Sequence, residues 1–261
     1  MEFKGTLGKY KIIATEDNTE TVYSEYFDEA CHNLSGAYAE TVYNYIEGCH
    51  IPDQITSNKN LHVLDVGFGI GMGLKALIEE SQKIPAPEVT SVSYTSMELD
   101  EELFLWAIKT HFPGIVFEKK NHFYQTSIPL FPRVTLEVRV YIGDGRITLP
   151  LAWDNRELAA MTAIFQDAFS PKKNPLLWTV EWFETLRKMS SPEVYLSTYS
   201  SSVGVRKSLL SAGWQIHNAK GFGQKRTMTK ARLNGTTDPE LAAELSRSKA
   251  LELRDILVKM K

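Results

Sequence analysis

Apolar residues in the central part of the chain recur with two different periods. Short apolar or alternating runs, typical of strands, are each followed by a segment with apolar residues three and four positions apart, typical of a helix. The pattern predicts strands at 61–66, 89–99, 134–144, 161–169, 193–200, 214–221 and 224–231. It predicts helices at 73–81, 101–112, 178–190 and 203–213. The stretch between 113 and 133 contains Pro129 and Pro132 and is interpreted as loops.

Alternating strands and helices are typical of a parallel sheet covered by helices on both faces. We therefore expect an α/β core at 58–235 with a mainly parallel, seven-stranded sheet. Residues 1–57 are expected to form an N-terminal extension packed on this core, with one helix over 37–48 that Gly48 ends. The tail 236–261 begins with a capping pattern and predicts an amphipathic C-terminal helix.

The loop LDVGFGIGMG, residues 64–73, joins the first predicted strand to the first predicted helix. Such a turn presents backbone N–H groups to a ligand at the carboxyl edge of the sheet. The chain lacks the Gly-Lys-Ser/Thr string of a P-loop, and the dinucleotide pattern GxGxxG fails in both glycine registers. What remains is Asp65-x-Gly67-x-Gly69-x-Gly71. A turn that needs small residues only for packing is the alternative interpretation.

This pattern resembles motif I of the class I S-adenosylmethionine-dependent methyltransferases, which have a Rossmann-like fold. Glycines let the backbone approach the cofactor closely, and Asp65 suits its ammonium group or a bound water. Glu98 and Asp144 end the next two predicted strands, where they can accept from ribose hydroxyls and from the adenine amino group. Three acids at successive strand ends favour this methyl donor over solvated strand ends. The expected cofactor-binding residues are Asp65, Gly67, Phe68, Gly69, Gly71, Glu98, Asp144 and Gly145.

The fourth predicted strand leads into FQDAFSPKKNPLLWT, residues 165–179. In this fold its end faces the transferred methyl group. An alkylamine has a pKa of about 10 and is protonated near neutral pH, so a carboxylate such as Asp167 can orient it and accept its proton. Phe169 and Trp178 are candidates for stacking on a planar substrate. A structural turn is the alternative interpretation of this loop.

Four longer motifs carry a more specific resemblance: DAFSPKKNPLLWT, YIGDGRITLP, STYSSSVGVRKSLLSAGW and GFGQKRTM. Together they resemble the methyltransferase domain of the MnmC family, bifunctional enzymes that modify the wobble uridine of tRNA, and its stand-alone relatives. The resemblance runs from about Thr21 to about Met228. It implies methyl transfer from S-adenosylmethionine to the amine of 5-aminomethyluridine, often 2-thiolated, with Asp167 as the acid nearest the amine.

The substrate-binding residues expected on these grounds are Phe169, Lys172, Asn174, Trp178, Lys225 and Arg226. The bifunctional enzymes usually carry Leu-Asp-Gly-Phe-Ala-Pro in the loop where residues 166–171 read Gln-Asp-Ala-Phe-Ser-Pro, as in the stand-alone branch. The family's flavin-dependent oxidase domain is not contained in these 261 residues. We therefore expect a separate enzyme to supply the aminomethyl precursor.

Charge is distributed unevenly along the chain. Residues 171–235 contain 11 Lys or Arg against 3 Asp or Glu, although the whole chain has a net charge of −3. Such a segment can bind a polyanion, or it can simply form a solvated surface. We expect phosphate contacts in the tRNA anticodon from Lys172, Lys173, Arg206, Lys207, Lys225 and Arg226.

Other classes of protein are disfavoured by what the chain lacks. No run approaches the roughly 20 apolar residues of a membrane helix, and the N-terminus has no export signal. The thiols of Cys31 and Cys49 match no metal spacing and are interpreted as reduced, and the six histidines form no ligand pair. We expect a cytoplasmic protein with no metal and no membrane partner.

Two rival functions remain open at this point. One is a class I methyltransferase, or an aminopropyltransferase, that acts on a free small amine. The other is a degenerate module that binds the cofactor or tRNA without catalysis. The basic segment weighs mildly against the first, and the presence of Asp65, Glu98, Asp144 and Asp167 together weighs against the second.

Overall fold

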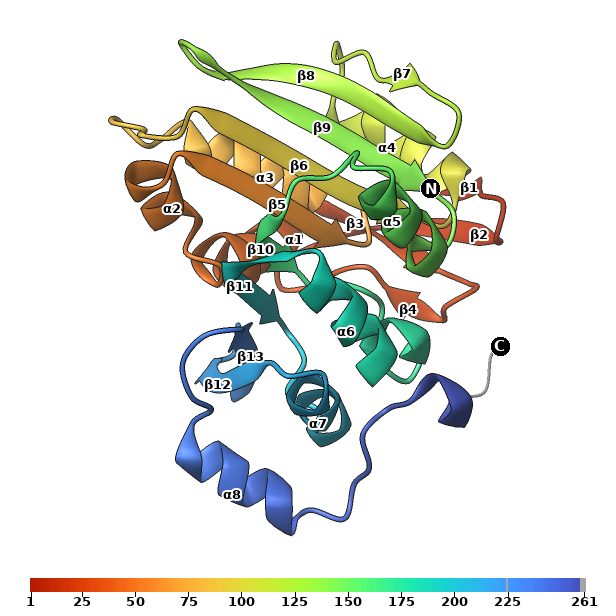
Figure 1. Cartoon of the computed structure of the whole chain (residues 1–261). Helices are drawn as coiled ribbons and strands as arrows, with labels where there is room; N and C mark the ends of the chain where they lie inside the picture. The colour runs from red at the N-terminus through yellow and green to blue at the C-terminus, as the bar shows by residue number, and fades with distance from the viewer. Residues whose placement is uncertain (224, 259–261) are drawn as a thin grey trace.

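The computed structural model describes residues 1–223 and 225–258. Its centre is one mixed sheet, shown in Figure 1. The predicted strands correspond to β5 (Asn60–Val66), β6 (Ser91–Glu98), β9 (Val134–Ile142), β10 (Met161–Phe165), β11 (Ser190–Thr198), β12 (Gln215–Lys220) and β13 (Thr227–Arg232). With β7 (Glu118–Lys119) and β8 (Phe123–Phe131), the order is β12-β13-β11-β10-β5-β6-β9-β8-β7. The strands β11, β10, β5, β6 and β9 pair in parallel, and the remaining pairs are antiparallel.

The sheet is thus an α/β sheet of the expected kind, but it is wider than seven strands. The prediction of loops between 113 and 133 was wrong because β8 pairs with β9 along its length despite Pro129. The register shifts between Pro129 and Phe131, and such an irregularity accommodates a residue that has no N–H for the ladder.

Helices cover both faces of the sheet (Figure 1). On one face lie α3 (Met72–Ser81) and α4 (Glu101–His111), and on the other lie α5 (Gly145–Asp154), α6 (Val180–Lys188) and α7 (Val203–Ser211). Each face has its own apolar core. The helix α5 was not expected from the sequence. It carries Pro150 in its interior, and its start is defined by Asp144, whose side chain accepts from the backbone N–H of Arg146.

The N-terminal extension forms a second, antiparallel sheet of β1 (Glu2–Lys4), β2 (Lys9–Ala14), β3 (Glu20–Ser24) and β4 (Glu29–Ala30). It is attached to the core through Asp100, the N-cap residue of α4. The Asp100 carboxylate also accepts from the backbone N–H groups of Thr6 and Leu7, at 3.0 and 2.9 Å, and from the Tyr10 hydroxyl. One carboxylate therefore joins the first turn of a core helix to the extension.

The helix expected over 37–48 is divided into α1 (Ala37–Thr41) and the π-helix η1 (Val42–Glu47), and α2 (Ile51–Ser57) follows. Gly48 ends the π-helix, as the sequence indicated. A Cβ at Gly48 would collide with the Asn44 carbonyl oxygen and the Ser197 hydroxyl, which hydrogen-bond to each other. The glycine therefore lets the π-helix lie directly on the end of β11.

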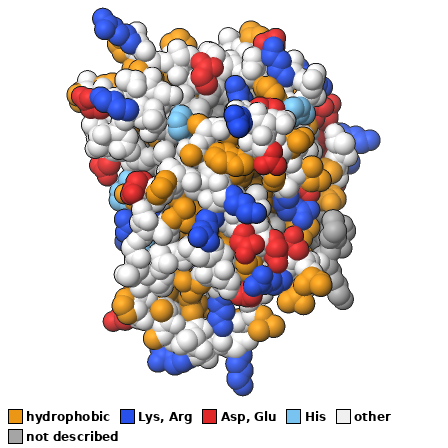
Figure 2. Space-filling view, viewed as in Figure 1, with side chains coloured by type: hydrophobic (Ala, Val, Ile, Leu, Met, Phe, Trp, Pro, Cys, Tyr) orange, Lys and Arg blue, Asp and Glu red, His pale blue; other side chains and the backbone are white. Residues whose placement is uncertain are grey.

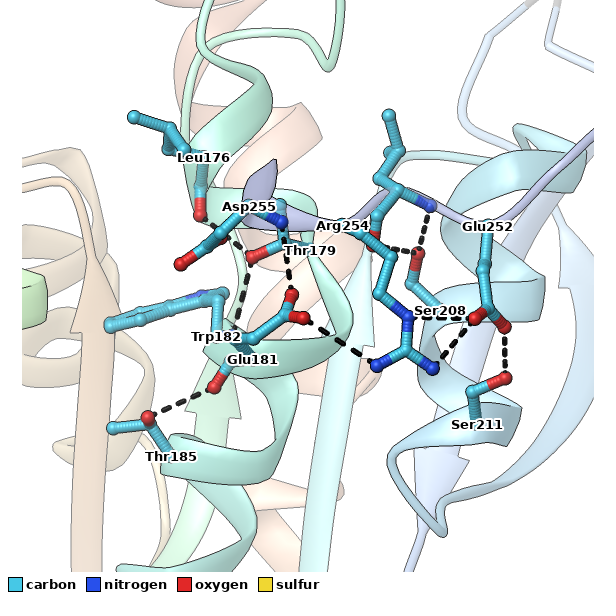
Figure 3. A network of polar contacts seen from close by, with 11 residues as sticks. Leu176, Thr179, Glu181, Trp182, Thr185, Ser208, Ser211, Glu252, Arg254 and Asp255 are labelled. Carbon is cyan, nitrogen blue, oxygen red and sulfur yellow. Dashed lines mark hydrogen bonds and ion pairs between the residues drawn. The ribbon is translucent and has the colours of Figure 1, made fainter. Parts of the chain in front are cut away.

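The prediction of one helix over 236–261 was wrong beyond Arg247. The helix α8 covers Pro239–Arg247, the following residues are extended, and a short turn, η3 (Asp255–Leu257), comes after them; residues 259–261 lie outside the described part. The extended segment is held between two helices, as Figure 3 shows around Arg254. The backbone of Leu253 accepts from Val180 N–H and donates to the Ser208 hydroxyl, both at 2.9 Å. These contacts require an extended backbone, because a helix would use the same groups internally.

None of the helices in the described residues is long and apolar enough to cross a lipid bilayer.

Candidate cofactor and substrate site

The glycine-rich loop lies between β5 and α3, at the carboxyl edge of the parallel strands. Gly67 and Gly69 have φ angles of 102° and 55°, a region that favours glycine. Both glycines line a cavity of about 270 Å³. The backbone N–H of Gly69 donates to the Glu98 carboxylate at 2.9 Å, so the loop is bound to the end of the neighbouring strand.

Two residues of the predicted loop have mainly a packing role. Gly71 has a φ of 80°, and a Cβ there would lie 2.6 Å from the Phe112 ring. It is not among the residues that line the cavity. Phe68 borders the cavity, but it is 2% exposed and its ring packs edge-on against Phe104 at 5.2 Å. Gly71 therefore shapes the turn, and its contact with the cofactor stays a prediction.

Asp65 lies at the end of β5 and is almost completely buried, at 2% exposure. Its pKa is raised to about 7, mainly by burial and to a smaller extent by the charge of Glu98, while a hydrogen bond from the Tyr94 hydroxyl opposes the shift. Gly73, in the first turn of α3, lines the cavity beside it. A Cβ at Gly73 would lie 2.6 Å from Asp65 Oδ2, so this glycine, which the sequence analysis missed, keeps the carboxylate in place.

Glu98 ends β6 and is also buried, at 9% exposure. Its Oε2 accepts from Gly69 N–H at 2.9 Å, and its Oε1 accepts from Asp100 N–H at 3.0 Å. Burial raises its pKa to about 7 in spite of these hydrogen bonds. Each carboxylate oxygen keeps a lone pair for a further donor, as recognition of two neighbouring hydroxyls requires.

Asp144 and Gly145 lie where β9 passes into α5, and both line the cavity. Besides capping the helix, the Asp144 carboxylate pairs with the Arg146 guanidinium at 2.7 Å. A Cβ at Gly145 would collide with the Met97 sulfur. The three acids predicted at successive strand ends therefore line one cavity.

Asp167 follows β10 and lines the same cavity. The Tyr45 hydroxyl donates to its Oδ1 at 2.5 Å. Burial raises the pKa of Asp167 well above the usual range, and the charges of Asp65 and Glu40 act in the same direction. Tyr45 and Lys225 oppose the shift. A carboxylate with a raised pKa is suited to accept a proton near neutral pH.

The N-terminal extension closes one side of the cavity. Tyr26, Phe27, Cys31 and His32 line it, although the sequence analysis assigned them no role. The aromatic residues of the stretch YSEYFDEA could have indicated Tyr26 and Phe27 from the sequence. The rings of Phe27 and Phe169 stack with centroids 4.3 Å apart.

Two polar contacts join the same elements, which we call the loop–extension contact. The Asp28 carboxylate pairs with the Lys173 ammonium at 2.6 Å, and the Glu29 carboxylate accepts from the Ser170 N–H at 2.9 Å. The Asp167 loop is thus held by the N-terminal extension.

The prediction that Trp178 stacks on a substrate was wrong. Trp178 is fully buried, and its indole N–H donates to the Phe169 carbonyl oxygen at 2.8 Å. Trp178 therefore holds the backbone of the loop at Phe169 from the buried side. The other three residues predicted in this loop, Phe169, Lys172 and Asn174, line the cavity.

The basic residues expected to contact phosphate have different environments. Arg206 is 4% exposed and donates to Thr229 and Asn218, so its prediction as a phosphate contact was wrong. Lys207 donates to the Ser248 carbonyl oxygen at 2.9 Å. Lys225 and Arg226 are exposed. On the face in Figure 2, basic and acidic side chains are interspersed rather than gathered into one patch.

The cavity fits the expected cofactor. The loop leaves the backbone accessible at Gly67 and Gly69, Glu98 retains acceptor capacity for ribose hydroxyls, and Asp65 provides an acid for a positively charged group. Among the described residues no group of three or more His, Cys, Asp or Glu side chains could hold a metal ion. The cavity therefore suits an organic cofactor, and the Asp167 side chain lies at its border.

Comparison with known proteins gives the same result. Residues 116–234 match a family described as S-adenosyl-L-methionine-dependent methyltransferase. The crystal structure of MnmC2 from Aquifex aeolicus is similar with a TM-score of 0.74 and 26% identity, covering 97% of this chain and 81% of that one. The chain is an S-adenosylmethionine-dependent methyltransferase that is similar to those of class I.

The methyltransferase is also similar to the tRNA 5-methylaminomethyl-2-thiouridine biosynthesis bifunctional protein MnmC of Paraburkholderia phymatum. The two are 28% identical over 232 residues, which cover 85% of this chain and 34% of that protein. The chain therefore spans about a third of the length of this relative. Spermidine synthase from Thermotoga maritima, at 12% identity and a TM-score of 0.55, shares the fold alone. The resemblance to MnmC that the motifs indicated is confirmed.

The buried acids predict an unusual pH dependence of stability. Asp65 and Glu98 have pKa values raised to about 7 in the folded protein, above their ordinary values of 3.8 and 4.5. At a pH between the ordinary and the raised pKa values, these two acids bind more protons in the folded state than in the unfolded state. Their contribution to the free energy of unfolding therefore falls as pH rises toward 7. We expect the ionisation of Asp65 and Glu98 to lower the free energy of unfolding of the cofactor-free protein by on the order of 2–4 kcal/mol between pH 5.5 and 8. Below pH 6.5 this is partly offset by His32, whose pKa is lowered to about 4 by burial.

Calorimetry across this pH range measures the effect. Glu98→Gln should flatten the decline, whereas Glu101→Gln, at a partly exposed carboxylate outside the cavity, should leave it unchanged. An equal pH dependence of the Tm in wild type and in Glu98→Gln would show that Glu98 is already ionised at pH 5.5.

Proposed function

We propose that the methyltransferase methylates the primary amine of 5-aminomethyluridine, with or without a 2-thio group, at the wobble position of tRNA. The position of Asp167 carries this proposal, because its carboxylate borders the cofactor cavity. The same cavity is lined by Phe169, Lys172 and Asn174 from the following loop. The similarity to MnmC covers 85% of the chain and supports this substrate, because the name of that protein specifies the biosynthesis of 5-methylaminomethyl-2-thiouridine, the methylated product.

In the proposed reaction a substrate ammonium group first gives a proton to Asp167. When bound, S-adenosylmethionine would supply the methyl group to the neutral amine, with the electrons of the broken S–C bond passing to sulfur as the N–C bond forms. The product leaves as a secondary ammonium ion, and Asp167 returns its proton to solvent. The loop–extension contact holds the loop that carries Asp167, and orientation of the amine accounts for much of the rate.

Phe169 is the proposed platform for the uracil ring. Its ring is partly exposed at the cavity and stacks on Phe27. Aromatic stacking of a splayed base is the usual way in which proteins bind single-stranded RNA. Lys172 and Asn174 at the same mouth supply hydrogen-bond donors for the base or its phosphate.

Lys225 and Arg226 are proposed to bind anticodon phosphates. Changing both to Glu should weaken tRNA binding and reduce the slope of log K against log salt by about 1–2, without changing the affinity for S-adenosylmethionine. Binding assays from about 50 to 200 mM salt measure this. The control reverses Lys9 and Lys11, which are 55% and 54% exposed on β2. Equal salt slopes for the two double variants would remove Lys225 and Arg226 from the interface.

The primary amine is proposed to come from an enzyme outside these 261 residues, since they span about a third of the bifunctional relative. A direct test of the substrate class compares methyl transfer to unmodified tRNA, to tRNA with 5-aminomethyluridine, and to free alkylamines. Transfer only to the aminomethylated tRNA supports the proposal. Faster transfer to a free amine would assign the site to a small-molecule methyltransferase.

A further inference from the structure

Tyr45 is the residue in closest polar contact with Asp167, and it comes from the N-terminal extension rather than from the core. Its hydroxyl donates to Asp167 Oδ1 at 2.5 Å. The tyrosine is 2% exposed, and it does not line the cofactor cavity. It therefore reaches the carboxylate from the side away from the cofactor.

The ring of Tyr45 is fixed by packing on β10, the strand that leads into Asp167. It stacks on Phe165, two residues before Asp167, with centroids 5.4 Å apart and planes 29° apart. The ring and the carboxylate are therefore both held at the end of β10. A hydroxyl in this position restricts rotation of the carboxylate.

The π-helix that carries Tyr45 is attached to the sheet on both sides of this residue. The Ser197 hydroxyl at the end of β11 donates to the Asn44 carbonyl oxygen, next to Gly48. The Cys49 thiol donates to the carbonyl oxygens of Ile164 and Tyr195, at 3.4 and 3.5 Å. A single π-helical turn is often found at a functional site, and here it directs one side chain to the carboxylate.

We propose that Tyr45 is a positioning residue for the methyl-transfer reaction: it holds one oxygen of Asp167 so that the other faces the substrate amine. This inference rests on the proposed function, because it assigns the proton-accepting step to Asp167. Tyr45 does not touch the reacting atoms. It acts through the orientation and the ionisation of the carboxylate.

The charges around Asp167 determine the sign of the expected pH effect. Burial, Asp65 and Glu40 raise the pKa of Asp167, whereas the Tyr45 hydrogen bond and Lys225 lower it. Loss of the hydroxyl therefore raises this pKa further, and the ionised form is reached at higher pH. The other titratable groups influenced by the Asp167 charge are Tyr94, Tyr199 and Cys31, whose pKa values are raised, so they stay neutral over the same range.

The test replaces Tyr45 with Phe, which keeps the ring on Phe165 and removes only the hydroxyl. We expect kcat on aminomethylated tRNA to fall about tenfold to hundredfold, with KM and the Kd for S-adenosylmethionine within about twofold. The acidic limb of the kcat–pH profile should move to higher pH. Tyr43→Phe is the matched control, because Tyr43 lies on the same π-helix and donates to the Lys220 carbonyl oxygen, away from Asp167.

A second measurement requires no substrate: the pKa of the Asp167 carboxyl group, read from its ¹³C chemical shift in wild type and in Tyr45→Phe. A higher pKa in the variant supports the inference, and an equal pKa overturns it. A fall in kcat with an unmoved acidic limb and a lower Tm would also overturn it, because that combination marks a structural role. If the wild type does not methylate tRNA, the proposed function fails, while the carboxyl pKa still decides the role of Tyr45.

Discussion

Replacing Asp167 with Asn should reduce kcat for methyl transfer by a factor of about 10²–10⁴, the usual contribution of a positioned general base. The amide keeps the shape of the carboxylate and an oxygen for the Tyr45 hydroxyl, but it cannot accept a proton from an ammonium group. Cofactor binding should persist, because the glycine loop and Glu98 are unchanged. Single-turnover kinetics with a saturating methyl donor measures the loss.

The same substitution should stabilise the protein above neutral pH. The pKa of Asp167 is raised well above its ordinary value by burial and by the charge of Asp65, so its ionisation favours the unfolded chain. Asparagine removes this cost, and the Tm of Asp167→Asn should exceed that of wild type at pH 8. A variant that is more stable and inactive is typical of an active-site acid. Full activity of Asp167→Asn would show that the amine loses its proton elsewhere.

Replacing Glu98 with Gln should raise the Kd for S-adenosylmethionine by about tenfold to hundredfold, the effect of losing charged hydrogen bonds in a buried site. In wild type the two carboxylate oxygens accept from Gly69 and Asp100 and retain lone pairs for the ribose. An amide nitrogen cannot accept, so one backbone N–H and one ribose hydroxyl lose their partner. Isothermal titration calorimetry measures the change.

Glu101→Gln is the matched control for this experiment. Glu101 lies three residues further on, in the first turn of α4, where it pairs with Lys119 at 2.7 Å outside the cavity. The same chemical change there should leave the cofactor Kd within about twofold, as for most surface substitutions. Equal affinities for wild type and Glu98→Gln would place the ribose elsewhere in the cavity.

The part of the site built from strand ends could be predicted from the sequence. Parallel strands bring their carboxyl ends to one edge, so Asp65, Glu98 and Asp144 had to lie together once the strands were recognised. The glycine spacing then distinguished a close backbone approach from a phosphate loop. These inferences depend on local pattern and on one rule of topology.

The parts that could not be predicted depend on contacts between distant segments. Tyr45 and Asp167 are 122 positions apart, and a helical period gives no indication that one hydroxyl reaches the other. Trp178 is an aromatic residue of the kind that stacks on bases. In the structure it is buried, and its indole N–H donates to the Phe169 carbonyl oxygen. Arg206 belongs to a basic segment, but its guanidinium is buried and donates to Thr229 and Asn218 on the final strand pair.

In the C-terminal tail the helical pattern of the sequence extends further than the helix itself. Its apolar period continues past Arg247, where the structure is extended. The backbone of Leu253 bonds to Val180 and Ser208 instead of to its own helix, and Arg254 pairs with Glu181 and Glu252 (Figure 3). Tertiary hydrogen bonds outweigh a local helical preference that is worth less than about 1 kcal/mol per residue.

Methyl transfer from labelled S-adenosylmethionine to tRNA from cells that lack this enzyme tests the central claim most directly, with nucleoside mass spectrometry to locate the product. We predict a gain of one methyl group on 5-aminomethyluridine, or on its 2-thio form, that is lost with Asp167→Asn. Measurable cofactor binding without any transfer to tRNA would contradict the assignment of the wobble uridine and leave only the methyltransferase fold and its cofactor cavity.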